Sequence, residues 1–304
     1  MRIGVIDIGS NTIKTSVFTI SDGRTDEIFS KTIHAKLSSH VKDESLTKKG
    51  THILIKSLCD LRRTARKMGC KRKNIYSFAT ACIRGVDNRY EILDLAKRCT
   101  KLKIELLDGE SEAELCFLGA LASKGCPKDG ILADLGGGSC EFVSFRAGKS
   151  VNALSLNVGA LVMHRCFSSG KYISRTENEG LADHLKNIFT KEVSALSADG
   201  SFPLIVTGGS ARAAVKLLSL LDKRDPSLPF EISVKRAEEL CDSFFNGELS
   251  DIYEKILSDR AQTLIPALTV FIEASKAVGS ESFTVIDGGA RLGVAKKILS
   301  QRKG

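Results

Sequence analysis

The chain has few of the residues that mark several large classes of protein. It contains no Trp, and Phe, Trp and Tyr together make up 6% of its 304 residues. Because RNA-binding platforms stack bases on aromatic side chains, we expect no sequence-specific nucleic-acid partner. No apolar run reaches the 18 or more residues that a membrane span needs, so we also expect no membrane partner. The first eight residues have the pattern of a strand rather than of a signal peptide.

Paired cysteines are also missing. The nine cysteines are scattered, none of them forms a CxxC pair, and their number is odd. This pattern argues against a disulfide framework and against a zinc site. The five histidines are dispersed and form no metal-binding motif. We therefore expect buried thiols in a reducing cytoplasm.

Positive charge is what the chain has in excess. It carries 45 Lys and Arg against 36 Asp and Glu, a formal net charge of +9. Such a balance favours an anionic partner: nucleic acid, a phosphorylated metabolite, polyphosphate or an anionic surface. The densest basic stretch lies between residues 62 and 73. Exposure to solvent explains most of these side chains. The more specific alternative is that they form a row that binds successive phosphate groups.

A glycine-rich turn between two apolar runs is the most distinctive motif. In ILADLGGGSCEFVSF, residues 131–145, the central residues are Asp134, Gly136, Gly137, Gly138, Ser139 and Glu141. Glycine permits a close backbone approach by a ligand, and backbone N–H groups at such a turn can bind a phosphate. Carboxylates on both sides of the turn suit a hard metal ion. Taken alone, a glycine-rich hairpin with two solvated acids explains the motif equally well.

The same pattern recurs along the chain. Asp7-Ile8-Gly9-Ser10-Asn11 matches Asp134-Leu135-Gly136-Gly137-Gly138, with an acid, an apolar residue and a glycine turn after a strand. Two further turns of this kind are Gly208-Gly209-Ser210 and Gly288-Gly289. A repeat this far apart indicates two similar domains rather than a solenoid. Four such turns predict a phosphate-binding cleft between the domains.

Strand-like runs alternate with amphipathic helices, which predicts an α/β fold. We place the boundary before the Gly- and Pro-containing stretch 125–130, which gives domains 1–123 and 124–304. The last helix, 292–300, is the element that would pack back on the first domain. The other main helices are predicted at 47–68, 90–100, 110–122, 178–198 and 260–279.

Together, the motifs resemble the exopolyphosphatase/guanosine pentaphosphate phosphatase family of the actin-like ATPase superfamily. IDIGSNTIKT, FATACIRG, LLDGESEAELCFLG, ADLGGGSCEFV, TGGSARA and DGGARLGV occur in the family's order over nearly the whole chain. The resemblance implies two actin-like (ribonuclease H-like) domains, with mixed sheets flanked by helices and an interdomain cleft. It also implies a metal-dependent hydrolase that releases orthophosphate from inorganic polyphosphate, and a homodimer, which is common in the family.

The resemblance also assigns roles to single residues. Glu112 falls on the family's catalytic Glu, the general base for the attacking water. Asp7, Asp134 and Glu141 fall on acids that support Mg²⁺ (or Mn²⁺) and water. The positions implied to bind phosphate are Ser10, Asn11, Lys14, Arg84, Gly136, Gly137, Gly138, Ser139, Gly208, Gly209 and Ser210. The chain departs from the family pattern at Lys14, Ser111, Glu114, Val162 and Leu292.

Three other activities remain open from the sequence. Hydrolysis of guanosine pentaphosphate uses the same glycine turns, so the turns do not separate it from polyphosphate hydrolysis. An ATP-dependent kinase of the same superfamily shares the turns but gives no reason for Glu112 at the start of a helix. A non-catalytic sensor of polyphosphate or of the alarmone is favoured only by the departures at Ser111 and Leu292.

Overall fold

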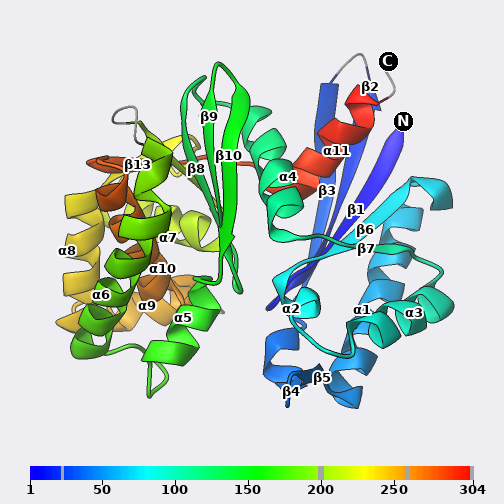
Figure 1. The fold of residues 1–304 in the computed structure, drawn as a ribbon, viewed down its shortest axis with the longest axis horizontal. Helices are drawn as coiled ribbons and strands as arrows, with labels where there is room; N and C mark the ends of the chain where they lie inside the picture. The colour runs from blue at the N-terminus through cyan, green and yellow to red at the C-terminus, as the bar shows by residue number, and fades with distance from the viewer. Residues whose placement is uncertain (22–23, 198–201, 258–259, 302–304) are drawn as a thin grey trace. The chain divides into compact units, whose positions relative to one another are not determined.

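The protein is a mixed α/β chain, as predicted. The computed structural model describes residues 1–21, 24–197, 202–257 and 260–301. The elements group into two compact units, and Figure 1 labels most of the elements. The first unit comprises Met1–Gly119 and Ala290–Gly304, and the second comprises Ala120–Gly289. The division thus falls after Gly119, whereas the sequence predicted it after residue 123.

The first unit is built on a five-stranded sheet in the order β3-β2-β1-β6-β7. These strands are β1 (Arg2–Ile8), β2 (Ile13–Ser21), β3 (Arg24–Ile33), β6 (Ile75–Ala79) and β7 (Ile104–Leu106). β2 is antiparallel to both β1 and β3, whereas β6 is parallel to both β1 and β7. The carboxyl ends of β1, β6 and β7 therefore meet at one edge of the sheet.

Helices cover both faces of this sheet. They are α1 (Lys48–Lys67), α2 (Ala81–Arg84), α3 (Arg89–Thr100), α4 (Gly109–Leu121) and α11 (Ala290–Ser300), and a small hairpin, β4 (Val41–Lys42) and β5 (Ser45–Leu46), precedes α1. Ile6 and Ile8 of β1 pack with side chains of α1 and α3. Ile3 and Val5 point to the opposite face, because successive side chains of a strand alternate, and there they pack with α4 and α11.

The last helix corrects the predicted domain assignment of residues 290–304. Ala295 and Ile298 of α11 are buried against Ile3 and Val5 of β1. A Cβ atom at Gly293 would overlap the backbone of α4, so the two helices are in very close contact. The helix therefore belongs to the first unit, the alternative that the sequence left open, because its apolar face completes the core of that unit.

The second unit contains a six-stranded sheet in the order β10-β9-β8-β11-β13-β12. Its strands are β8 (Gly130–Leu135), β9 (Cys140–Arg146), β10 (Lys149–Leu156), β11 (Leu204–Thr207), β12 (Phe230–Ser233) and β13 (Ser282–Val285). Its helices are α5 (Ala160–Phe167), α6 (Arg175–Glu192), α7 (Gly209–Leu221), α8 (Val234–Phe245), α9 (Ser250–Leu257) and α10 (Leu264–Ala277). β8, β11 and β13 are parallel, so their carboxyl ends also share one edge.

Two predicted helices have different limits in the structure. The helix predicted at 178–198 begins earlier, at Arg175, because Ser174 and Glu177 form a capping box. It ends at Glu192, and residue 198 lies outside the described residues. The helix predicted at 260–279 begins at Leu264, which places Pro266 in its first turn. Proline is tolerated there because the amides of the first turn have no intrahelical acceptor.

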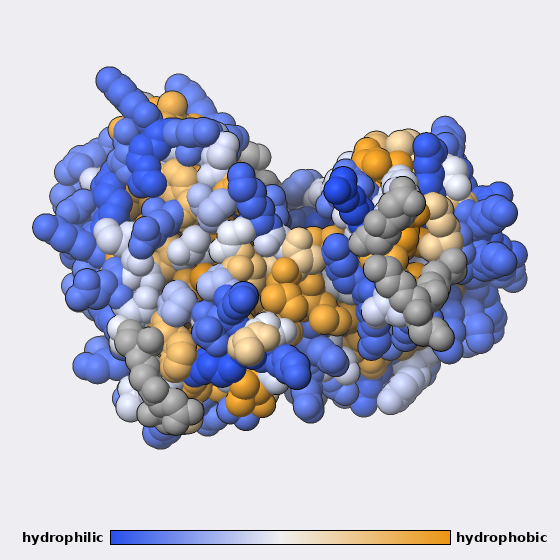
Figure 2. Space-filling view, turned by 90° about the horizontal axis from the view of Figure 1, so that it is seen from above, coloured by the Kyte–Doolittle hydropathy of each residue, from blue (hydrophilic) through white to orange (hydrophobic). Residues whose placement is uncertain are grey.

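Apolar side chains are gathered inside the units and hydrophilic residues cover most of the face that Figure 2 shows. In the described part of the chain, no helix has the length and apolar character to cross a membrane. All nine cysteines are free, and five are buried as expected. The expectation of buried thiols is wrong for Cys99 and Cys166, which lie at exposed positions of α3 and α5.

Candidate functional site

In the first unit, the predicted site residues follow the carboxyl ends of the three parallel strands. Asp7 lies near the end of β1, Arg84 ends the short helix after β6, and Glu112 lies in the first turn of the helix after β7. Pairing of Asp7 with Phe78 in β6, and of Phe78 with Glu105 in β7, brings the three strand ends level with one another. Ligands of α/β sheets bind at this kind of edge.

Arg84 and Glu112 form an ion pair at this edge. The Arg84 guanidinium donates to Oε2 of Glu112 at 3.1 Å and to the carbonyl of Leu107 at 2.8 Å. The Glu112 side chain is 11% exposed and that of Arg84 26%. The pair is therefore largely shielded from bulk water, and the carboxylate is held in one orientation by a fixed cation.

The start of α4 holds Glu112 in place. The Asp108 carboxylate accepts a hydrogen bond from the Ser111 amide at 2.7 Å, and the Asp108 carbonyl accepts one from the Glu112 amide at 3.0 Å. Hydrogen bonds from Ser111 lower the pKa of Asp108, and the positive charge of Arg84 lowers it further. Asp108 thus acts as a charged helix cap that fixes the first turn, and with it the base of the Glu112 side chain.

Asp7 lies beside a cation that sequence reasoning missed. The Arg291 guanidinium of α11 lies 3.4 Å from Oδ2 of Asp7 and donates to the Ser16 hydroxyl at 2.8 Å. Lys14, a predicted phosphate contact, is the strand partner of Asp7 across the β1–β2 hairpin. Arg291 belongs to the DGGARLGV motif, but only the folding of α11 onto β1 brings it to this place.

The turn after β1 is fixed through its carbonyl groups. The amide of Ser38 donates to the Ser10 carbonyl at 3.0 Å, and the amide of Lys36 donates to the Asn11 carbonyl at 2.8 Å. The Ser10 side chain is buried, and that of Asn11 is half-buried. The loop after β3 thus orients the predicted phosphate-binding turn.

In the second unit, three glycine turns come together at the carboxyl ends of β8, β11 and β13. Gly208 has a φ of 114°, and a Cβ atom there would overlap the carbonyl of Leu135. Gly289 has a φ of 96°, and its Cβ position lies 3.7 Å from Oδ2 of Asp134. The turns at 136–138, 208–209 and 288–289 thus lie close to Asp134. The fourth predicted turn, at Gly9, belongs to the first unit, so the convergence of all four stays a prediction.

The turn at 136–138 is shaped by the beginning of α5. The amides of Gly159, Ala160, Leu161 and Val162 donate to the carbonyls of Gly138, Gly136, Gly137 and Gly137, at 3.0–3.3 Å. A Cβ atom at position 159 would overlap the backbone of Gly137 and Gly138, so this contact requires glycine. Within the described residues, the amides of Gly137 and Gly138 donate to no protein acceptor. Backbone N–H groups left without an acceptor are suited to an anion.

Asp134 and Glu141 form a carboxylate pair beside this turn. They are direct partners of the antiparallel strands β8 and β9, so their side chains lie on the same face of the sheet. Glu141 is buried and accepts a hydrogen bond from the Ser155 hydroxyl at 2.8 Å. Burial, and then the charges of Glu141 and Asp134, raise the pKa of the Cys140 thiol well above its usual value. Burial thus disfavours the thiolate form of Cys140 in the folded protein.

The carboxylate pair fits part of a divalent-metal site. Asp134 and Glu141 provide the oxygen donors that Mg²⁺ prefers. Among the described residues, no three His, Cys, Asp or Glu side chains form a group able to hold a metal ion. The predicted set of Asp7, Asp134 and Glu141 therefore stays a prediction, with Asp7 placed in the first unit and the other two in the second.

A second missed residue, Arg260, lies at the beginning of α7. Its guanidinium nitrogen is 2.5 Å from the Cβ position of Gly209, the first residue of this helix. The buried hydroxyls of Thr207 and Ser210 nearby have no hydrogen-bond partner in the described structure. The amides of a helix N-terminus and a guanidinium both attract anions. The start of α7 therefore has the donors of a phosphate site, in line with the predicted roles of Gly208, Gly209 and Ser210.

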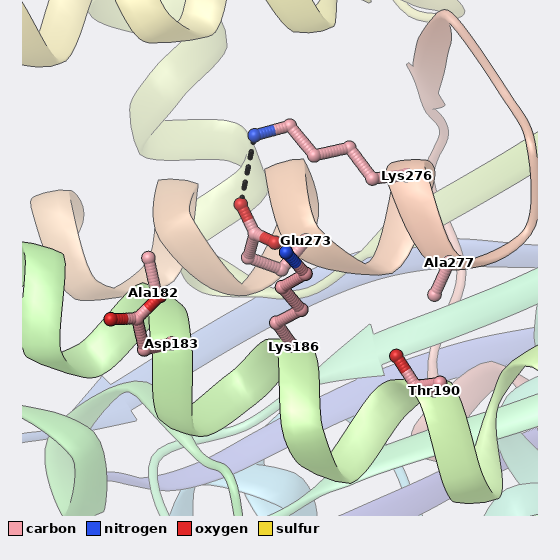
Figure 3. Close-up of a pocket in the computed structure, with 7 residues that line it drawn as sticks. All are labelled: Ala182, Asp183, Lys186, Thr190, Glu273, Lys276 and Ala277. Carbon is pink, nitrogen blue, oxygen red and sulfur yellow. Dashed lines mark hydrogen bonds and ion pairs between the residues drawn. The ribbon is translucent and has the colours of Figure 1, made fainter.

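A pocket elsewhere in the second unit lacks this character. It has a volume of about 390 Å³ and lies between α6 and α10 (Figure 3). Lys186 and Lys276 line it together with Asp183 and Glu273, and Lys276 pairs with Glu273 at 2.9 Å. The two signs of charge balance, and none of the predicted site residues lines this pocket. It is therefore not the phosphate site.

Comparison with known proteins identifies the family of the chain. The family model described as the Ppx/GppA phosphatase family matches residues 16–302. Exopolyphosphatase 1 of Mycobacterium tuberculosis (strain H37Rv) is 32% identical over 163 residues, which are 53% of this chain and 47% of that protein. The guanosine-5'-triphosphate,3'-diphosphate pyrophosphatase of Photobacterium profundum is 22% identical, with 74% of this chain and 44% of that protein covered. The match to the first curated relatives thus spans about half of their length.

Solved structures show the same fold. The Ppx/GppA family member from Aquifex aeolicus superposes with a TM-score of 0.83 at 21% identity, covering 100% of this chain and 99% of that one. An exopolyphosphatase from Cytophaga hutchinsonii gives a TM-score of 0.87 at 18% identity, with 99% and 98% covered. The chain therefore belongs to the Ppx/GppA phosphatase family and has its actin-like, two-domain α/β fold.

Proposed function

We propose that this protein is an exopolyphosphatase, which hydrolyses the terminal phosphoanhydride of inorganic polyphosphate and releases orthophosphate. The observation that carries the proposal is the shielded ion pair between Arg84 and Glu112 at the carboxyl ends of β6 and β7. A carboxylate fixed at a ligand-binding edge, in a family of phosphatases, is suited to accept a proton from water. Phosphoryl transfer needs little more of the protein than positioning and charge neutralisation.

Glu112 is assigned the role of general base. Its carboxylate takes a proton from the water that attacks the terminal phosphorus atom, while the bond to the next phosphate breaks. The chain shortened by one unit leaves with the electron pair of that bond. Arg84 keeps the carboxylate oriented and is also assigned a contact to a phosphate oxygen, since its guanidinium offers several donors.

The remaining site residues are assigned to binding of phosphate oxygens. In the second unit these are the amides of the 136–138 turn and the start of α7, with Arg260 added to the predicted set. In the first unit they are Ser10 and Asn11, in the turn after β1, and Lys14 of β2. Such donors hold the substrate where the charge develops, without having to reorganise during the reaction.

A divalent cation is assigned to the carboxylate pair of the second unit. Asp134 and Glu141 would hold Mg²⁺ (or Mn²⁺), and the bound ion supplies neutralisation of phosphate charge. Asp7 remains the predicted third acid, and its neighbour Arg291 supplies positive charge at that position already.

Phosphate release from several substrates tests the proposal. The purified chain would be assayed with Mg²⁺ on long-chain polyphosphate, guanosine pentaphosphate and ATP in parallel, and again with a metal chelator. We expect release from polyphosphate that the chelator abolishes. Phosphorylation of a second molecule from ATP without free phosphate would instead indicate a kinase. Tight binding of polyphosphate with no release would indicate a sensor.

Hydrolysis of guanosine pentaphosphate at its 5′ end is the second candidate. It is favoured by the similarity to the Photobacterium profundum enzyme, which extends over 74% of this chain. The glycine turns bind phosphates in either substrate, so they do not discriminate. Faster phosphate release from guanosine pentaphosphate than from polyphosphate, at equal concentrations of cleavable ends, would favour this candidate.

A further inference from the structure

A cluster of positive side chains lies at the other end of the first unit's parallel strands. We call it the basic edge, and its members are Arg2, Lys67, Lys71, Arg72, Lys73, Lys101 and Lys103. All seven side chains are exposed. They come from four segments: the start of β1, the end of α1, the loop between α1 and β6, and the loop between α3 and β7. The proposed function does not use any of them.

The pairing of the strands brings these segments together. Because Gly4 of β1 pairs with Ile75, the first residue of β6, Arg2 lies beside the 3₁₀ turn Arg72–Asn74 that leads into β6. The Asn74 side chain donates to the Arg2 carbonyl at 3.3 Å. Lys103 directly precedes β7, and the Ser77 hydroxyl of β6 donates to its carbonyl at 3.0 Å. Lys103 is level with Tyr76, three positions further along the strands than Lys73. Since neighbouring strands are about 4.8 Å apart and each residue adds about 3.3 Å, the backbones of Arg2, Lys73 and Lys103 lie within roughly 15 Å of one another.

The positive charge of the basic edge is not neutralised by the protein. Within the described residues, no ion pair joins any of its seven side chains to an acid. Asp60 pairs with Lys31, and Asp94 pairs with Arg98. The dipole of α1 accounts for Lys67 in the last turn of that helix. It does not account for the members that lie in the loops after α1 and α3. The cluster therefore concentrates positive potential for which folding alone gives no reason.

The composition of the basic edge favours a chain of phosphates over a nucleic acid. Five of its seven members are lysines, whose compact charges bind phosphate oxygens without demanding one orientation. None of its members is aromatic, whereas proteins that bind single-stranded nucleic acids stack successive bases on aromatic side chains. Inorganic polyphosphate has the same repeating negative charge and no bases to stack.

The basic edge is distinct from the candidate catalytic site. β1 runs from Arg2 to Ile8, seven residues, so the two edges of the sheet are about 20 Å apart. Asp7, Arg84 and Glu112 follow strand ends, whereas the basic edge precedes strand starts. A ligand that bridges both edges must therefore be long.

We propose that the basic edge is a secondary binding site for long-chain inorganic polyphosphate. The proposal rests on the proposed exopolyphosphatase activity. A chain held at the basic edge keeps its other parts at a high effective concentration near Glu112. Short substrates cannot reach both edges and gain nothing. The basic edge thus sets a preference for long chains through affinity and leaves the chemical step unchanged.

Two quadruple variants with the same charge test this proposal. The first is Lys67→Gln, Lys71→Gln, Arg72→Gln, Lys73→Gln, which leaves Arg2 in place because Arg2 donates to the Met68 carbonyl. The control is Lys191→Gln, Lys223→Gln, Lys235→Gln, Lys255→Gln, all outside the first unit and away from its basic edge. Each removes four charges and takes the formal net charge from +9 to +5. Thermal unfolding establishes that both variants are folded.

The readouts are KM and kcat for long-chain polyphosphate and for tripolyphosphate, and Kd for fluorescently labelled long-chain polyphosphate at several salt concentrations. For the basic-edge variant we expect KM and Kd for the long chain to rise about tenfold or more, with kcat and tripolyphosphate kinetics unchanged. The slope of log Kd against log salt should become shallower by roughly one for each phosphate group that the variant no longer binds. The control should stay close to the native protein.

Two results would overturn the inference. One is equal binding of the long chain by the basic-edge variant and the control. The other comes from competition for labelled polyphosphate. If a single-stranded RNA of equal charge displaces it as well as unlabelled polyphosphate does, the surface is assigned to nucleic acid. Binding is measured without turnover, so a native protein that binds long chains at the basic edge but releases no phosphate would refute only the proposed function.

Discussion

The two units use the same edge of their sheets for different chemical groups. In the first, the carboxyl ends of β1, β6 and β7 present charged side chains, and the Arg84–Glu112 pair is the most shielded of them. In the second, the ends of β8, β11 and β13 present glycine turns, whose backbone amides are the donors. A carboxylate side chain can accept a proton during a reaction, whereas a backbone amide can only donate a hydrogen bond to the substrate. The proposed function therefore places the general base, Glu112, in the first unit, and the glycine turns and the proposed metal site in the second.

The largest expected effect on stability comes from the glycine that shapes the phosphate turn. Gly159→Ala puts a methyl group into the backbone of Gly137 and Gly138, which forces α5 away from the turn. We expect a loss of about 2–3 kcal/mol in the free energy of unfolding, measured by denaturant titration.

Gly180→Ala is the matched control for this change. Gly180 lies inside α6, and a Cβ atom added there would have no neighbouring atom within 4 Å apart from the backbone of its own helix. Alanine there should raise the free energy of unfolding by about 0.5–1 kcal/mol, because it favours the helix. Equal effects of the two substitutions would show that the turn tolerates movement of α5, and would weaken its assignment as a rigid phosphate cradle.

A smaller effect, on substrate affinity, is expected from Arg260→Gln. Loss of the guanidinium at the start of α7 removes a charged donor from the proposed phosphate site. The KM for polyphosphate should rise about tenfold, with kcat little changed, because a hydrogen bond to a charged group contributes roughly 1.5–3 kcal/mol. Steady-state phosphate release gives both constants.

Arg224→Gln is the control for Arg260, since Arg224 is exposed and lies over the Phe230 ring, 4.3 Å from its centre. It should leave both constants unchanged. A fall in kcat for Arg260→Gln at constant KM would contradict the division between the units, because it would place a group needed for the chemical step in the second one.

The smallest effect is expected at the helix cap of the first unit. Hydrogen bonds from Ser111 lower the pKa of Asp108 in the folded protein, so its charged form adds stability above the pKa of the unfolded chain. That contribution is lost as the pH falls through the folded-state pKa. At pH 7 thermal unfolding should occur at the highest temperature for the native protein, lower for Asp108→Asn and lowest for Asp108→Ala.

The difference between the native protein and Asp108→Asn should shrink as the pH falls below the pKa of the unfolded chain, about 3.9, and disappear only below the still lower pKa of the folded protein, where the carboxylate is protonated. Asparagine keeps an acceptor for the Ser111 amide, whereas alanine does not. A difference between the native protein and Asp108→Asn that is independent of pH would show that the charge of Asp108 has no part in holding Glu112.

Local patterns allowed much of the fold to be predicted. The helix predicted at 90–100 is α3, Arg89–Thr100, and the glycine turns follow strands as expected, because periodicity and turn residues act over a few positions. β12 was missed, since its four residues lie between a proline loop and a helix and carry too short a pattern. The docking of α11 could be given only as an alternative, because it depends on a partner far away in the chain.

The candidate site was predictable where a motif carries its residues. Glu112 and Arg84 were assigned separately from two motifs, and the structure shows that they touch. Arg260 was missed because no motif lies next to it in the sequence. Arg291 lies in the DGGARLGV motif, but only folding brings it to Asp7, as it brings Arg260 to Gly209. The need for glycine at position 159 could not be predicted, because it arises from contact with the 136–138 turn.

Turnover and binding by Glu112→Gln test the division between the units most directly. Glutamine keeps the shape of the side chain and an acceptor for Arg84 but cannot take a proton. We expect kcat for phosphate release from polyphosphate to fall by about 10²–10⁴-fold, while Kd for polyphosphate stays close to the native value. Glu91→Gln, which removes an exposed acid from the first turn of α3, should leave both constants unchanged. Near-normal turnover by a Glu112→Gln protein that binds polyphosphate would contradict the assignment of the base and of the first unit as the source of the chemistry.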